Sequence, residues 1–122
     1  MSESRTVVLL CVDLMMISTI SVAASRKKLM FRTVETVEQL RKCTEEDLVL
    51  IDMSTPGLCI EQAAAALNNH QKQSAVVYGP HVRTEQFEQA RKAGFEHVMA
   101  RGRFSAEAGE IVNDFSETGW TA

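Results

Sequence analysis

The chain has 122 residues, the length of one ordinary domain, and its hydrophobic fraction of 45% fits a globular protein and argues against a disordered one. Its formal net charge is only -3 and it contains no block of five like charges, so its charge pattern gives no indication of nucleic-acid binding. The three cysteines are an odd number and form no CxxC motif, so the sequence indicates neither a disulfide framework nor a zinc site.

The first element is an apolar segment over residues 7–25, which has the length and the small residues of a signal-peptide core. Asp13 lies in its middle, and a charge at the centre of an inserted helix costs about 2.5–3.5 kcal/mol. We therefore expect a buried strand followed by a helix, with Cys11 in the core and no membrane-spanning segment. Reduced thiols and a cytoplasmic location fit the cysteine pattern.

Five short apolar runs predict five β-strands. The predicted strands are residues 6–12, 29–34, 48–51, 75–78 and 97–100. The first, third and fourth runs are continuously apolar and rich in Val and Ile, which is typical of strands that are covered on both faces of a sheet.

Segments with helical spacing follow each run. The predicted helices are residues 15–28, 36–43, 59–70, 84–94 and 105–115. Threonine or serine caps begin the second, fourth and fifth of them. The third is rich in alanine and reaches Asn68 near its end, and Asn is a common helix stop, as is Gly94 at the end of the fourth.

Strands and helices alternate along the chain, and this order predicts parallel strands joined by right-handed crossovers. Five such pairs predict an α/β fold with three layers, a doubly wound (βα)5 parallel sheet with the flavodoxin-like strand order 2-1-3-4-5. Because no linker, repeat or low-complexity tract interrupts the pattern, we expect a single domain over residues 1–122 with a core over residues 6–115.

Polar residues or turns follow four of the predicted strands: Asp13 the first, Asp52 the third, Gly79 the fourth and Arg101 the fifth. Ligands of such sheets bind beyond the carboxyl ends of the strands, and strands 1 and 3 are neighbours, so we expect the two aspartates to lie close together. Two carboxylates form an oxygen site that suits Mg²⁺. A carboxylate beside Mg²⁺ can accept a phosphoryl group, whose charge Arg101 could neutralise.

Over residues 6–115 the chain resembles the receiver domain of two-component response regulators. The resemblance is strongest in DLVLIDMSTPG (47–57) and in RKAGFEHVMARGRFS (91–105). It implies that Asp52 stands at the phosphoacceptor aspartate and that Asp13 is one member of the acidic pair that ends strand 1. It also implies that Ser54 stands where a backbone carbonyl helps to bind the metal.

The chain departs from this family at several positions of the site. Leu14 stands where the second acid of the pair would be, which weakens Mg²⁺ binding because ligand charge drives that affinity. Gly79 replaces the serine or threonine that binds the phosphoryl group, and Val98 the aromatic switch residue. Arg101 replaces the lysine of strand 5, and the planar guanidinium of arginine is not equivalent to the compact ammonium group of lysine. Arg103 is the alternative pocket cation.

We therefore expect a degenerate receiver that is not an enzyme, a cytoplasmic module of bacterial type that acts by protein–protein interaction without an output domain. The resemblance implies a separate protein partner and a homodimer through the fourth helix, fifth strand and fifth helix. An ion pair of Arg101 with Asp13 or Asp52 would occupy the site without a metal.

Two alternatives stay open. One is a genuine phosphoacceptor in a phosphorelay, in which a histidine kinase phosphorylates Asp52 and Mg²⁺ is held by Asp13, Asp52 and Ser54. The other is a sensor that binds a small molecule in a pocket near Asp13, Gly79 and Arg101.

Overall fold

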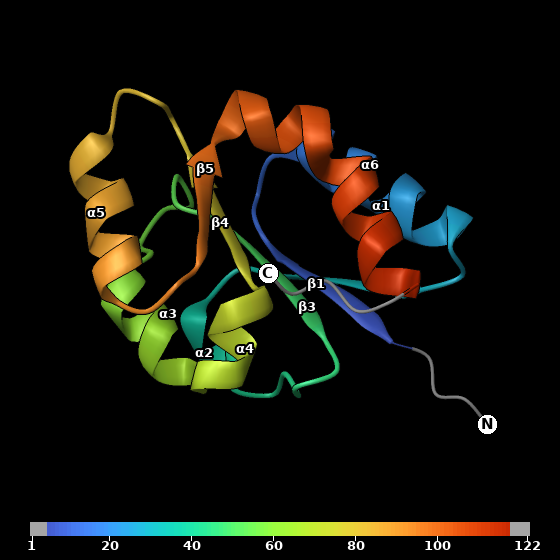
Figure 1. The fold of residues 1–122 in the computed structure, drawn as a ribbon, viewed down its shortest axis with the longest axis horizontal. Coiled ribbons are helices and arrows are strands. Elements are labelled where there is room, and N and C mark those ends of the chain that lie inside the picture. The colour runs from blue at the N-terminus through green and yellow to red at the C-terminus, as the bar shows by residue number, and fades with distance from the viewer. Residues whose placement is uncertain (1–4, 118–122) are drawn as a thin grey trace.

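A five-stranded parallel sheet forms the centre of the computed structural model, which describes residues 5–117 (Figure 1). The strands are β1 (Thr6–Leu10), β2 (Met30–Val34), β3 (Leu48–Asp52), β4 (Val76–Gly79) and β5 (His97–Ala100). Their order across the sheet is β2-β1-β3-β4-β5, and every neighbouring pair is parallel. The predicted fold class and strand order are confirmed.

Helices cover both faces of this sheet. They are α1 (Leu14–Arg26), α2 (Val37–Leu40), α3 (Ile60–Ala66), α4 (Asn69–Ser74), α5 (Thr84–Lys92) and α6 (Arg101–Glu117). Leu9 and Leu50 belong to the hydrophobic layer under α1 and α6, whereas Leu10 and Ile51 belong to the layer under α2, α3 and α5. Because successive residues of a central strand enter opposite layers, both must be apolar, which explains the continuous apolar runs.

The chain between β3 and β4 differs from the prediction of one helix over residues 59–70. α3 ends at Ala66, and Asn68 begins a second helix instead of ending the first. The Asn68 side chain accepts the backbone N–H of Gln71, and the Gln71 side chain accepts the backbone N–H of Asn68, both at 2.8 Å. This reciprocal capping box satisfies two donors at the new N-terminus and turns the chain toward β4.

The last helix begins earlier than its predicted start at Ser105. α6 starts at Arg101, directly after β5, so no loop separates strand and helix. Its buried stripe begins at Phe104 and continues with helical spacing to Phe115, and burying Phe104 requires a helical turn before it. The arginine that was expected in a loop is therefore held in the first turn of a helix.

Two glycines have the backbone conformation that their turns require. Gly94 follows the C-cap of α5 with a φ of 110°, and Gly57 follows Pro56 with a φ of 79°; both values lie in a region that favours glycine. Within residues 5–117 no helix combines the length and the hydrophobicity that crossing a membrane demands.

Candidate functional site

At the carboxyl ends of β1 and β5, an acidic and a basic side chain come together. Asp13 caps the N-terminus of α1, and its Oδ1 accepts the backbone N–H of Met15 at 3.0 Å. Its Oδ2 forms an ion pair with the guanidinium of Arg101, in the first turn of α6. Because β3 and β4 lie between β1 and β5, this ion pair crosses over the ends of the two central strands.

Asp52 lies at the end of β3 beneath this crossing, and its side chain is buried, with a relative exposure of 4%. Its Oδ1 accepts the backbone N–H of Ser54 at 2.8 Å. Its Oδ2 accepts the thiol of Cys11 at 3.4 Å. Within residues 5–117 the four ion pairs leave out Asp52, so neutral donors stabilise this carboxylate.

Cys11 connects the two aspartates to β4. Its sulfur accepts the backbone N–H of Asp13 at 3.3 Å and the hydroxyl of Tyr78 at 3.5 Å, while its thiol donates to Asp52. Burial raises the pKa of Cys11 to about 11, and burial also raises the pKa of Tyr78 well above its ordinary value. Both groups keep their protons at neutral pH and can act as donors.

Tyr78 carries this network to the far side of the site. Its ring stacks on Phe104 of α6, with 4.1 Å between the ring centroids and 6° between the planes, and both side chains are fully buried. Asp52, Cys11, Tyr78 and Phe104 thus form a continuous series of contacts from the end of β3 to α6.

Cys11 lies in the core, as its apolar surroundings in the sequence predict, but neither its polar contacts nor those of Tyr78 were predicted. Each residue stands in an apolar run of the sequence and is typical of core packing. The available signal was position: Cys11 is two residues before Asp13, and Tyr78 directly precedes Gly79.

The positions where the chain departs from the receiver pattern have their own packing. A Cβ on Gly79 would lie 3.0 Å from Cε and 3.3 Å from Cβ of Met53, so Met53 fills the space where a hydroxyl-bearing side chain would begin. Leu14 is 79% exposed, and Val98 is buried in the core. Arg103 pairs with Glu107 of its own helix at 3.0 Å, so the arginine that reaches the acids is Arg101.

These oxygens fit Mg²⁺ poorly as they stand. Within residues 5–117 no group of three or more His, Cys, Asp or Glu side chains could hold a metal ion. Asp13 already has Arg101 as its counter-charge, and the side chain of Leu14 supplies no oxygen. A metal would have to displace the guanidinium before Asp13 and Asp52 could share it.

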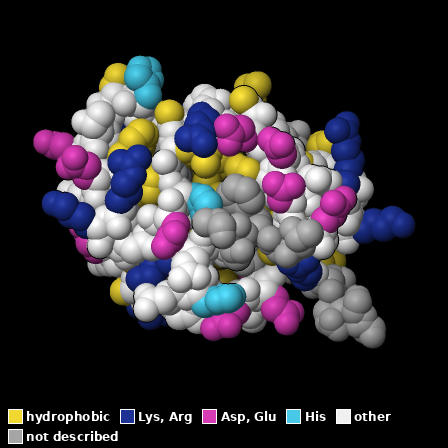
Figure 2. All heavy atoms as spheres, viewed as in Figure 1, with side chains coloured by type: hydrophobic (Ala, Val, Ile, Leu, Met, Phe, Trp, Pro, Cys, Tyr) yellow, Lys and Arg dark blue, Asp and Glu magenta, His cyan; other side chains and the backbone are white. Residues whose placement is uncertain are grey.

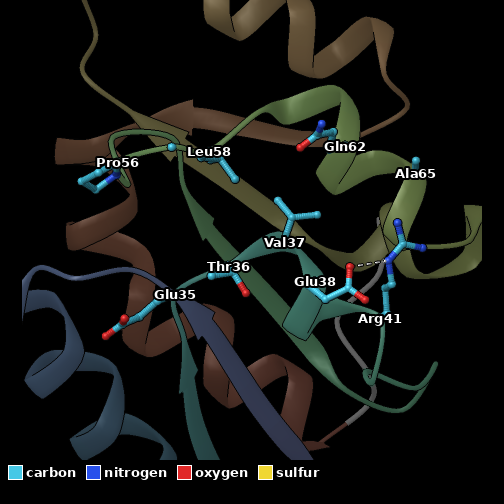
Figure 3. A pocket seen from close by; sticks show the side chains of 10 residues that line it. Glu35, Thr36, Val37, Glu38, Arg41, Pro56, Leu58, Gln62 and Ala65 are labelled. Atoms are coloured by element: carbon cyan, nitrogen blue, oxygen red, sulfur yellow. Dashed lines mark hydrogen bonds and ion pairs between the residues drawn. The ribbon is translucent and has the colours of Figure 1, made fainter.

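Two cavities lie beside the turn after β3. One of about 520 Å³ opens between α2 and α3. Figure 3 shows Val37 and Leu58 pointing into it and the Glu38–Arg41 ion pair on one side. A second cavity, of about 270 Å³, lies between α3 and α5.

Neither a protein-family model nor a curated protein sequence matches the chain. Solved protein structures do match the chain. A response regulator from Hahella chejuensis superposes with a TM-score of 0.74 at 16% identity, covering 98% of this chain and 99% of that one. The phosphorylated cyanobacterial phytochrome response regulator RcpA superposes with a TM-score of 0.71 at 13% identity, covering 95% and 96%.

A third match is the receiver domain of a sensor histidine kinase from Pseudomonas aeruginosa, with a TM-score of 0.65, 14% identity and coverage of 95% and 100%. That domain holds a magnesium ion in its active-site cleft, so Mg²⁺ does bind to proteins with this fold. At these identities the likeness concerns the fold. The chain therefore has the fold of response-regulator receiver domains over nearly its whole length.

Proposed function

We propose that this protein is a receiver-like signalling module of the two-component type in which Arg101 takes the place of the metal ion. The observation that carries the proposal is the Asp13–Arg101 ion pair across the ends of β3 and β4. The guanidinium is always protonated, and its planar fork can neutralise a carboxylate without a metal. Such a module works by binding another protein and catalyses no reaction of its own.

The surroundings of Asp52 support a site that has lost phosphoryl transfer. Asp52 is 4% exposed, and each of its oxygens already accepts a hydrogen bond. A phosphoryl group arriving there would find Gly79 and the side chain of Met53 where a hydroxyl would bind it. Without such a donor, a phosphate has little differential contact with which to shift the conformation.

The surface formed by α5, β5 and α6 is our candidate for partner binding and for a homodimer. β5 is an edge strand of the sheet, and an edge strand is a position at which another chain can bind. Figure 2 shows acidic side chains gathered over α6, and the last turn of α5 carries the basic residues Arg91 and Lys92. Opposite charges on the two helices favour a contact in which α5 of one copy meets α6 of another.

The test is a challenge with acetyl phosphate, with and without millimolar Mg²⁺, followed by intact-mass spectrometry. We expect no Mg²⁺-dependent phosphoryl adduct on the wild-type protein and none on Asp52→Ala. An adduct that forms on the wild type and is lost in Asp52→Ala would overturn the proposal in favour of a genuine phosphoacceptor.

A gain-of-function variant makes a negative result informative. Leu14→Asp with Arg101→Lys restores the family's acid and lysine, and we expect it to bind Mg²⁺ more tightly than the wild type. The matched control is Leu14→Asp with Arg103→Lys, which leaves the Asp13–Arg101 pair in place. Equal Mg²⁺ affinity in both double variants would show that Arg101 does not occupy the metal position.

A further inference from the structure

The cavity between α3 and α5 has an apolar floor and a polar wall of one charge sign. Met53, Leu58 and Ile60 supply the apolar surface. Glu61, Gln86 and Gln89 supply the polar surface, and the described residues that line the cavity include no Lys or Arg. A ligand that fills this space gains by burying hydrocarbon and by carrying a positive charge.

The polar wall contains a buried acceptor that lacks a donor. The Oε1 atom of Gln86 is buried and, within residues 5–117, has no hydrogen-bond partner. Glu61 also lines the cavity, and its exposed carboxylate accepts a hydrogen bond from the thiol of Cys59 at 3.4 Å. A buried acceptor without a donor is unfavourable, and a ligand that supplies the donor recovers that free energy.

We propose that this cavity binds a small primary alkylammonium ion. An ammonium group has three donors and no acceptor, so it can pair with Glu61 and donate to Gln86 at the same time. The volume of about 270 Å³ lies below that of sites for drug-sized ligands, which suits an amine with a short aliphatic chain. The proposal goes beyond the signalling role above and does not depend on the state of Asp52.

Occupancy of the cavity would reach the candidate site through Met53. The Met53 side chain lines the cavity and fills the space beside Gly79. In the sequence, Met53 directly follows Asp52. Its backbone N–H donates to the carbonyl of Tyr78 at 2.8 Å. A ligand that presses on Met53 therefore acts on a residue that joins the ends of β3 and β4.

The probe is n-butylammonium chloride, titrated into the full-length ¹⁵N-labelled protein and followed by ¹H–¹⁵N NMR. We expect saturable shifts centred on residues 53, 58–61 and 86–89. Sodium butyrate and 1-butanol, which share the hydrocarbon but lack the cation, should not saturate in the same range. Equal binding of butyrate or butanol, or no saturable shift with the amine, would overturn the proposal.

Two variants test the polar contacts. Glu61→Gln and Gln86→Leu should each weaken butylammonium binding about fivefold, the factor that corresponds to one lost hydrogen bond. The control Glu38→Gln removes an acid that lines the other cavity and should leave the affinity unchanged. If Glu61→Gln, with a wild-type urea midpoint, binds as tightly as the wild type, the proposal is wrong.

A chemical readout distinguishes this cavity from a surface site. Butylammonium should slow the alkylation of Cys59 by iodoacetamide and leave the alkylation of Cys43, which lies outside the cavity, at its original rate. Equal rates at Cys59 with and without the amine would place the ligand elsewhere. None of these measurements involves Mg²⁺ or phosphorylation, so their outcome is independent of the acetyl phosphate test.

Discussion

The buried network around Cys11 makes the substitution Cys11→Ala unusually costly for the loss of one atom. The change removes the acceptor of the Tyr78 hydroxyl and the donor to Asp52, both of which are buried. An unpaired buried polar group costs about 1–3 kcal/mol. Since the backbone N–H of Asp13 lies near solvent and can find water, we expect a loss of about 2–4 kcal/mol in the free energy of unfolding.

Tyr78→Phe separates the hydrogen bond from the ring stack. Phenylalanine keeps the contact with Phe104, so this variant should lose only about 1 kcal/mol. In the double variant with Cys11→Ala, the hydroxyl that would be left unpaired is absent. The two losses should therefore be less than additive, by about 1 kcal/mol.

The assay is urea unfolding at pH 7 followed by circular dichroism, with unchanged m-values as the condition for comparing free energies. The control is Cys59→Ala, which removes a half-exposed thiol that donates a hydrogen bond to the exposed carboxylate of Glu61. This change should alter the free energy of unfolding by less than about 0.5 kcal/mol. A Cys11→Ala loss no larger than the control, or strictly additive losses with Tyr78→Phe, would refute the reasoning.

Three other predictions concern the same site. Gly79→Ser should destabilise the protein by about 1–3 kcal/mol because its Cβ crowds Met53, and a urea midpoint at or above the wild-type value would contradict this packing. Arg101→Met should change stability by less than about 1 kcal/mol because the ion pair is partly exposed, yet it should raise Mg²⁺ affinity in calorimetry, whereas Arg103→Met should not. The free energy of unfolding should fall between about pH 9 and pH 11, because burial raises the pKa of Cys11 from 9.0 in the unfolded chain to about 11 in the folded state. The stabilisation by the protonated thiol is complete below pH 9 and is lost as the pH rises through about 11. Cys11→Ala should make urea midpoints measured across this range fall less steeply, and an unchanged slope would exclude the thiol as the cause.

The fold was predictable because two independent patterns agree. The continuous apolar runs at 48–51 and 75–78 indicate strands covered on both faces, and the helical segments between the runs require parallel crossovers. The same reasoning placed Asp13 and Asp52 at one edge of the sheet, because strand order fixes which strand ends are neighbours. Both aspartates lie at that edge, connected through Cys11.

The details of the site depended on contacts between residues far apart in the chain. An ion pair of Arg101 with Asp13 was one of several pairings that the sequence allowed, and only the early start of α6 aims that guanidinium across the sheet. Asn68 can end one helix or begin another, and the choice depends on the reciprocal bond with Gln71. Cys11 is typical of core packing until the hydroxyl of Tyr78 is placed beside it.

The occupancy of a site by a cation that belongs to the chain depends on concentration differently from its occupancy by an ion bound from solution. The occupancy of a metal site rises and falls with the concentration of the free ion. A tethered group has a local concentration that the fold alone sets, and dilution or chelation does not change it. If Arg101 serves as the cation of this site, the charge balance around Asp13 will be the same at every cellular level of Mg²⁺.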